Sequence, residues 1–301
     1  MASKEAILFS DSRSASISLV IPALNEGLNL APTLENFRAT LPEPSEILVV
    51  DDGSTDLSID SLPPANNLRV VRLQRQGAAR ARNIGARQAQ GEIIVFADAH
   101  VRVTAGWWEP LAESLADPRV GAVAPVISVM GHEQSKGFGM RWNGPSFGVE
   151  WLPPQGNEPH PVGLAPGCLL AMRRNVFQAT GGFDDGMILW GMEDSELSLR
   201  LWLLGYELRL IPSVEVAHLF REKHPYRIDW SCVIHNMLRV AFCHFHEKRI
   251  ERVVGALKRY RDFARALSLF AQSDVLLRRQ SLERERVRDD QWFFERFPMS
   301  V

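Results

Sequence analysis

Four short apolar runs, alternating with helical or turn-forming segments, constrain the fold of this chain more than any other feature of its sequence. The runs cover residues 17–21, 47–50, 68–73 and 93–97. Helical patterns follow the first run, over residues 27–41, and the third, over residues 77–90. Continuous apolar runs of this length are typical of strands that are buried on both faces of a parallel sheet. The alternation predicts an α/β fold with a doubly wound, mostly parallel sheet.

Polar side chains follow three of the four runs. Asn25 and Glu26 come after the first, Asp52 lies in the acidic turn after the second, and Asp98 and His100 come after the fourth. In an extended chain, residues two positions apart point the same way, so Asp98 and His100 would converge on one point. Because the carboxyl ends of parallel strands share one edge of the sheet, we expect Asp52 to face the same crevice.

A carboxylate beside an imidazole suits Mn²⁺ or a similar divalent cation, so Asp98 and His100 predict a metal that holds a phosphate. Arg75, just before the Ala/Arg-rich helix, would face the same crevice. Acids, a base and a metal around one crevice suit a nucleotide. These residues alone leave a plainer interpretation open, in which Asp98 caps a helix, His100 lies on the surface and Asp52 only forms a turn.

Two further polar clusters lie in the second half of the chain. Glu193 and Asp194 begin a helix after Trp190, where they either oppose the helix dipole or include a general base. A stretch of nine residues, expected to be a loop because Pro225 ends any helix, carries His218, Arg221, His224 and Tyr226. Histidines in such a stretch are either surface and core residues or metal ligands, and both interpretations stay open at this point.

The composition excludes several classes of protein. The chain has 34 Lys and Arg against 36 Asp and Glu, without the basic excess of a protein that binds nucleic acid in bulk. No run approaches the ~18 apolar residues that span a bilayer, and the first residues form no apolar signal-peptide core. The three cysteines follow no metal-ligand spacing. We therefore expect a reduced, cytoplasmic protein without a transmembrane segment, with peripheral membrane contact through a basic amphipathic helix left open.

Taken together, these motifs resemble the GT-A-fold nucleotide-sugar glycosyltransferases, and most specifically the catalytic domain of polypeptide N-acetylgalactosaminyltransferases. The resemblance covers about residues 16–250. It runs through the segments at residues 20–26, 50–54, 96–100, 106–110, 190–193 and 218–226, and through the segment around Arg75. The most specific of these are Asp-Ala-His at 98–100 and His-Leu-Phe-Arg-Glu-Lys-His-Pro-Tyr at 218–226.

The resemblance implies a role for each motif. The residues implied to bind Mn²⁺, which would bridge the UDP diphosphate, are Asp98, His100 and His218. The residues implied to contact the nucleotide are Pro22, Asn25, Glu26, Asp52, Arg75, Asp98 and Ala99. Asp52 would contact uracil, and Pro22 stands where the family often has Thr. Those implied to close over the phosphates are Arg221, His224 and Tyr226. Trp190 and Glu193 would line the sugar and its reacting centre.

One departure from the family pattern concerns stereochemistry. Asp194 stands where those transferases have Asn, and related inverting transferases carry an acid there that serves as base for the acceptor. The resemblance otherwise implies retention. We therefore expect a Mn²⁺-dependent transferase of GalNAc or GlcNAc from a UDP-sugar to a hydroxyl acceptor, which could be a peptide Ser or Thr, a glycan or a small molecule. Two alternatives stay open: an inverting transferase that makes a polysaccharide or glycolipid with Asp194 as base, and an inactive nucleotide-sugar-binding scaffold.

The same motifs and patterns also predict the domain organisation. Residues 1–15 form a flexible N-terminus, and 16–227 a GT-A catalytic domain with a nucleotide-binding half at 16–126 and an acceptor and lid half at 127–227. Residues 228–301 form a C-terminal helical extension, with helices at 228–249 and 250–272 and a tail that docks back onto the body. Within the second half we expect a long loop at 130–162 that walls a site, and an edge strand at 208–211.

Overall fold

The computed structural model describes residues 16–299, so the expected flexible segment 1–15 lies outside the described residues. The four apolar runs form four parallel strands, β1 (Ile17–Ala23), β2 (Ser45–Asp51), β3 (Leu68–Arg72) and β4 (Ile93–Ala97). They lie side by side in the order β3-β2-β1-β4. Their carboxyl ends therefore share one edge of the sheet.

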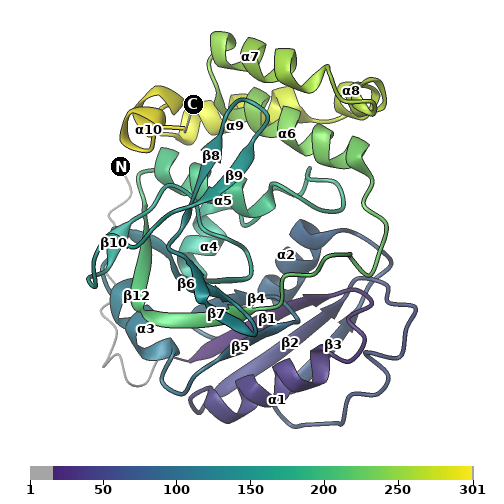
Figure 1. Ribbon diagram of the computed structural model, residues 1–301, viewed down its shortest axis with the longest axis vertical. Coiled ribbons are helices and arrows are strands. Elements are labelled where there is room, and N and C mark those ends of the chain that lie inside the picture. The colour runs from purple at the N-terminus through teal and green to yellow at the C-terminus, as the bar shows by residue number, and fades with distance from the viewer. Residues whose placement is uncertain (1–15, 300–301) are drawn as a thin grey trace.

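The other half of the sheet is mixed. It contains β5 (Val101–Val103), β6 (Val120–Val129), β7 (His132–Gly137), β10 (His160–Pro161), β11 (Leu169–Arg173) and β12 (Glu207–His218). β11 runs antiparallel to both β4 and β6, and β12 runs parallel to β6. The main path of the sheet is β10-β12-β6-β11-β4-β1-β2-β3, with β5 paired to β12 and β7 to β6 (Figure 1).

Two expectations for the second half were wrong. Residues 130–162 are not a structureless loop, because they contain β7, β10 and a separate hairpin of β8 (Met140–Asn143) and β9 (Gly148–Trp151). The expected edge strand at 208–211 belongs to β12, which pairs with β6 on one side and with β10 and β5 on the other. A register shift between Ile211 and Glu215 carries β12 past Pro212, where the sequence suggested that the strand ends.

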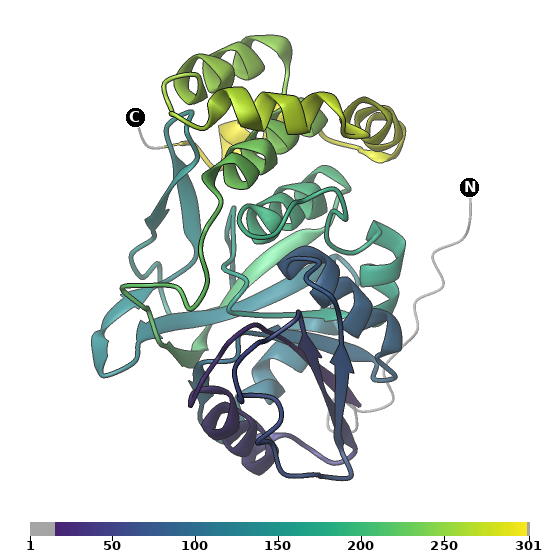
Figure 2. The same ribbon diagram turned by 90° about the vertical axis from the view of Figure 1, so that its right-hand side faces the viewer.

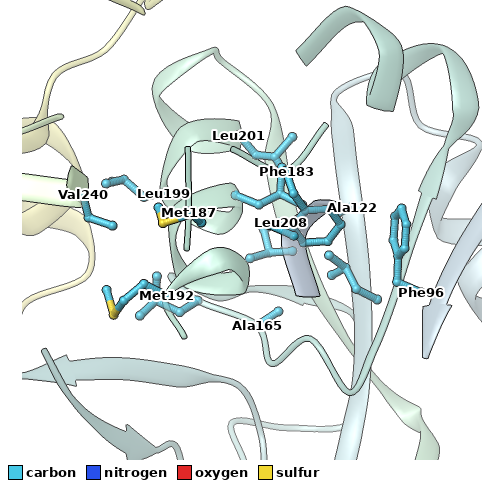
Figure 3. Close-up of a cluster of buried hydrophobic side chains, with 14 of the residues drawn as sticks. Phe96, Ala122, Ala165, Phe183, Met187, Met192, Leu199, Leu201, Leu208 and Val240 are labelled. Atoms are coloured by element: carbon cyan, nitrogen blue, oxygen red, sulfur yellow. The ribbon is translucent and has the colours of Figure 1, made fainter. Parts of the chain in front are cut away.

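Helices cover both faces of the sheet. α1 (Leu30–Thr40) and α3 (Trp108–Leu115) bury their apolar side chains on one face. α2 (Ala78–Gln88), α4 (Arg174–Thr180) and α5 (Glu193–Leu203) cover the other. Figure 3 shows this second core, with Phe96 and Ala122 of the sheet towards one side, Leu199 of α5 towards the other, and Leu201 and Leu208 between them. This arrangement confirms the predicted α/β fold with a doubly wound sheet.

A layer of helices follows the last strand of the sheet. It consists of α6 (Trp230–His244), α7 (Glu247–Leu257), α8 (Phe263–Ala271), α9 (Val275–Glu285) and α10 (Asp290–Arg296). Figures 1 and 2 show these helices gathered at one end of the molecule, with the β8–β9 hairpin reaching up to them. The expected helix at 250–272 is divided into α7 and α8. No helix of residues 16–299 has the length and apolarity to cross a bilayer.

The last described residues, up to 299, pack against the body, as expected of the tail. The ring centroid of Phe297 lies 5.0 Å from that of Trp202 on α5, and Trp292 lies 5.9 Å from the same ring. Phe293 is buried and approaches Trp142 of the hairpin at 6.2 Å. The helical layer therefore shares one apolar core with the sheet domain.

Candidate metal centre and nucleotide site

Three side chains from distant parts of the chain meet at the carboxyl edge of the sheet. Asp98 directly follows β4, His100 lies two residues later, and His218 is the last residue of β12. β12 pairs antiparallel with β5, so His218 lies opposite Val101, and the N–H of Leu219 donates to the carbonyl of His100 at 3.1 Å. One potential ligand atom from each of the three residues lies within 4.8 Å of the other two.

The chemistry of this group fits a divalent cation. Nε2 of His218 is 3.4 Å from Oδ2 of Asp98, and the two imidazole rings have centroids 4.9 Å apart. One carboxylate and two imidazoles form a donor set that suits Mn²⁺ and neighbouring first-row metals. Burial would raise the pKa of Asp98, but its bond with His218 and the charge of Arg82 hold that pKa well below its usual range. Asp98 is therefore ionised, which is the form that binds a metal.

Arg82 of α2 is a central residue that the sequence motifs did not reveal. Its guanidinium donates to Oδ1 of Asp98 at 3.1 Å and to Oε1 of Glu193 at 3.0 Å, and 5% of its side chain is exposed. A signal was present, because Arg82 shares one helix face with Ala79 and Ala86, which are both buried. A buried arginine on an apolar face requires acidic partners, and here they are a candidate metal ligand and the first acid of α5.

A cavity of about 400 Å³ adjoins the three ligands. Besides Asp98, His100 and His218, the predicted residues that line it are Pro22, Glu26, Asp52, Arg75, Ala99, Trp190, Glu193, Asp194, Arg221, His224 and Tyr226. The predicted contact that does not line it is Asn25. The amide oxygen of Asn25 instead accepts from the N–H of Thr55 at 2.7 Å and of Asp56 at 3.3 Å, which joins two loops at the edge of the sheet.

Asp52 fixes the start of α2 at one side of the cavity. Its carboxylate accepts from the N–H of Gln76 at 2.6 Å and of Gly77 at 2.9 Å. Burial raises the pKa of Asp52 in spite of these two bonds. Gly77 has a φ of 95°, and a Cβ there would lie 2.6 Å from the backbone of Leu189. Only glycine therefore lets the start of α2 approach the loop that carries Trp190.

The loop after β12 folds over the cavity. The ring of His224 lies 5.1 Å from that of Trp190, and the guanidinium of Arg75 lies 5.4 Å from the ring of Tyr226. Burial and the charge of Arg221 lower the pKa of His224. Burial, with the Glu193 carboxylate nearby, raises the pKa of Tyr226 to about 12. Both side chains are therefore neutral near pH 7, and they supply hydrogen bonds rather than charge.

The two acids at the start of α5 have different surroundings. Oε2 of Glu193 accepts from the N–H of Gly191 at 2.8 Å, and burial raises the pKa of Glu193 although Arg82 opposes this. Oδ2 of Asp194 accepts from the N–H of Gly167 at 3.0 Å, and Oδ1 from its neighbour Ser195 at 2.6 Å. Glu193 thus belongs to the Arg82 network, whereas Asp194 holds the segment beside Cys168 in place.

Residues 130–162 were expected to wall a site, and they do line one side of the cavity, although as strands rather than as a loop. Met140 of β8, Trp151 of β9 and Phe220 line this side. The rings of Trp151 and Phe220 meet edge to face at 6.1 Å. Gly137 makes room for Trp151, since a Cβ there would lie 2.0 Å from its ring.

Comparisons with known proteins place the chain among glycosyltransferases. Residues 18–181 match the model of glycosyl transferase family 2, and residues 161–225 match that of the N-terminal domain of galactosyltransferase. Because the first match covers more than half of the 301 residues, the chain belongs to glycosyl transferase family 2. The resemblance that the motifs indicated is confirmed.

Relatives of similar sequence carry related names. Polypeptide N-acetylgalactosaminyltransferase 8 of Drosophila melanogaster is 34% identical over 229 residues, which are 69% of this chain and 38% of that protein. Polypeptide N-acetylgalactosaminyltransferase 11 of Xenopus tropicalis is 32% identical over 220 residues, 65% of this chain and 36% of that protein. The chain therefore spans less than half of the length of these relatives.

Solved structures show the same fold. The crystal structure of GalNAc-T7 with UDP, GalNAc and Mn²⁺ superposes with a TM-score of 0.78 at 24% identity, covering 94% of this chain and 57% of that one. A mannosyltransferase from Pyrobaculum calidifontis, in complex with GDP-Man and Mn²⁺, gives a TM-score of 0.52 at 21% identity, covering 88% and 71%. These likenesses confirm the GT-A fold.

Proposed function

We propose that this chain is a Mn²⁺-dependent glycosyltransferase that moves a sugar from a UDP-sugar to a hydroxyl acceptor. The observation that carries the proposal is the Asp98–His100–His218 group, which lies in the wall of a cavity also lined by Arg75 and Glu193. The relatives named as N-acetylgalactosaminyltransferases support GalNAc as the sugar, with GlcNAc as the second candidate. The solved structure that contains UDP and Mn²⁺ supports this donor and metal.

The side chains that line the cavity divide into two sets: one would hold the diphosphate, and the other would hold the nucleoside. Asp98, His100 and His218 would hold the cation, which when bound offsets the negative charge that develops on the departing diphosphate. Arg221 brings a guanidinium to the same region and would act in the same direction. Asp52 and Arg75, which also line the cavity, would receive the base and the ribose.

The loop after β12 would act as a lid. In the structure it rests on the site through the His224–Trp190 and Tyr226–Arg75 contacts. A closed lid excludes water from the donor, which disfavours its simple hydrolysis. Neutral His224 keeps one ring N–H, which would donate a single hydrogen bond to a phosphate oxygen.

Retention of the anomeric configuration is the stereochemical outcome that we propose. An inverting reaction requires a carboxylate that is free to take the acceptor's proton. Asp194 is the candidate for that base, and both of its oxygens already accept backbone N–H groups. Glu193 is engaged by Arg82 and by the N–H of Gly191. Each oxygen of Asp194 keeps a second lone pair, so the contacts hold Asp194 in place without excluding it as a base, and the proposal of retention rests on the resemblance of the metal and lid motifs.

The acceptor that we propose is the hydroxyl of a Ser or Thr in a polypeptide. The apolar side of the cavity, formed by Met140, Trp151 and Phe220, offers a surface for side chains that flank such a hydroxyl. The names of the relatives support the same class of acceptor. A glycan would use the same aromatic rings as stacking surfaces.

The proposal is tested by a donor screen with Mn²⁺. UDP release is measured from UDP-GalNAc, UDP-GlcNAc, UDP-galactose and UDP-glucose, first without acceptor and then with Ser- and Thr-containing peptides. We expect one N-acetylhexosamine donor to be preferred, EDTA to stop the reaction, and His218→Ala to lower kcat/KM by at least about 100-fold. His132→Ala, at an exposed residue of β7, is the matched control. The anomeric proton of the product then reports retention or inversion by NMR.

Two results would contradict the proposal. Turnover that persists in EDTA or in His218→Ala would remove the metal group from the reaction. UDP binding without turnover of any donor, in all acceptors tried, would favour the inactive nucleotide-sugar-binding scaffold.

A further inference from the structure

Glu26 joins a candidate metal ligand to the lid from a buried position. Its carboxylate oxygen Oε2 is 3.2 Å from Nδ1 of His100. The same oxygen accepts from the guanidinium of Arg221. Glu26 is 6% exposed, so this contact is shielded from solvent. The Glu26 carboxylate is therefore fixed on two sides, by the imidazole of His100 and by the guanidinium of Arg221.

The turn that carries Glu26 is held rigidly. Asn25 has a left-handed backbone with φ 54° and its N–H donates to the hydroxyl of Ser54 at 3.0 Å. The N–H of Gly27 donates to Asp56 at 2.9 Å, and Asn29 bonds the carbonyl of Glu26 through its own N–H at 3.1 Å and its side chain at 3.0 Å. Because of these bonds, Asn25 stabilises the turn and does not line the cavity. The same bonds hold the side chain of Glu26 against His100.

We propose that Glu26 is a positioning residue that fixes His100 for metal binding. The inference rests on the proposed function, and it extends that function by giving the metal group a partner that selects one imidazole nitrogen. When Glu26 accepts the Nδ1–H of His100, the ring is held in the tautomer whose Nε2 carries a lone pair. That nitrogen is then the one that binds the cation. Carboxylate partners of this kind orient metal-binding histidines and raise their basicity.

Arg221 completes the arrangement. It balances the charge of the buried Glu26 carboxylate, which would otherwise be costly to bury. His218 has no matching carboxylate on its Nδ1, which is buried and without a hydrogen-bond partner among the described residues. The two histidines of the group are therefore not equivalent, and the partner on His100 is specific to that ligand.

The test is a double-mutant cycle read by Mn²⁺ affinity rather than by activity. Binding of MnCl₂ is measured by the electron paramagnetic resonance of the free ion in the unaltered protein, Glu26→Gln, His100→Ala and the double variant. We expect Glu26→Gln to weaken Mn²⁺ binding about 10- to 100-fold. In the His100→Ala background we expect the same substitution to change affinity by less than about twofold, because Glu26 acts through His100.

The matched control is Glu46→Gln, which removes the charge of an ion-paired carboxylate at the start of β2, the opposite end of the strand from the site. It should leave Mn²⁺ affinity unchanged. A measurement that needs no variant is ¹⁵N NMR of the histidines, which should find neutral His100 protonated on Nδ1.

The outcomes separate the two proposals. If the unaltered protein binds no Mn²⁺, both the proposed function and the proposed role of Glu26 are contradicted. If it binds Mn²⁺ but Glu26→Gln has no effect, or an equal effect with and without His100, the positioning role is overturned and the metal site stands. An Nε2–H tautomer of His100 would overturn the positioning role by itself.

Discussion

Arg82 is the residue on which the electrostatics of the site depend most. It is buried between Asp98 and Glu193 at 3.1 and 3.0 Å, and its removal would leave two carboxylates close together without a compensating charge. We expect Arg82→Met to lower the free energy of unfolding by about 3–5 kcal/mol, which denaturant titration of the metal-free protein measures. Arg80→Met, at the exposed neighbouring arginine of α2, should change it by less than about 0.5 kcal/mol. If Arg82→Met lowered the free energy of unfolding by as little as Arg80→Met, then burial of Asp98 and Glu193 would not depend on Arg82.

Asp194 gives a second prediction at the level of single residues. Its carboxylate holds the N–H groups of Gly167 and Ser195, and Asn in its place keeps one of the two acceptor oxygens. We expect Asp194→Asn to lower kcat by no more than about tenfold, equivalent to about 1.4 kcal/mol, with retention unchanged. A loss of about 1,000-fold or more would identify Asp194 as an essential base and favour the inverting alternative.

Residues that belong to a sequence motif were predicted well, whereas residues whose role depends on contacts between distant elements were not. The sequence predicted that Asp98, His100 and His218 belong together, and the structure places them in one group. It did not predict the contacts of Arg82 or of Glu26, because those contacts join elements that are distant along the chain. Asn25 was expected to contact the nucleotide, but its side chain closes the turn beside the site.

Among the elements, α6 supports the loop that carries Trp190. Asn236 of α6 is fully buried, and its side chain donates to the carbonyls of Ile188 at 3.0 Å and Gly191 at 2.8 Å. It also accepts from the N–H of Ile188 at 2.8 Å. The loop needs this support because Leu189 and Met192 have positive φ values of 55° and 75°, which are unfavourable for such side chains.

We therefore predict that Asn236→Leu damages the donor site from outside it. The substitution leaves buried backbone groups of the loop unpaired, so the free energy of unfolding should fall by about 1–3 kcal/mol per group. The KM for the UDP-sugar should rise as the position of Trp190 is lost. Asn175→Leu, at an exposed position of α4 with a local bond from the N–H of Val176, is the control. An unchanged KM in Asn236→Leu would show that the helical layer does not position the site.

The elements themselves were predictable in proportion to their length and burial. The parallel strands β1, β2 and β4 each contain a run of buried apolar residues, and each was predicted within two residues at either end. The strands of residues 130–162 have two to six residues and much exposed surface, so they carry little apolar periodicity. β12 was predicted only over residues 208–211, whereas the strand continues past Pro212 through a register shift between Ile211 and Glu215.

At the scale of the whole molecule, the site joins three parts of the fold. The parallel half of the sheet supplies Asp52 and Asp98, the mixed half supplies His218 and the lid, and the helical layer supports the Trp190 loop. The aromatic core shared by Trp142, Phe245 and Phe293 links the hairpin to that layer. Loss of the layer should therefore disturb the donor site as well as stability.

The measurement that tests the central claim most directly is calorimetric titration of UDP into the protein with and without Mn²⁺. We predict that Mn²⁺ strengthens UDP binding by at least about tenfold, equivalent to about 1.4 kcal/mol, and that the gain disappears in His218→Ala but not in His132→Ala. Equal UDP affinity with and without Mn²⁺, or a gain that survives the loss of His218, would contradict the account.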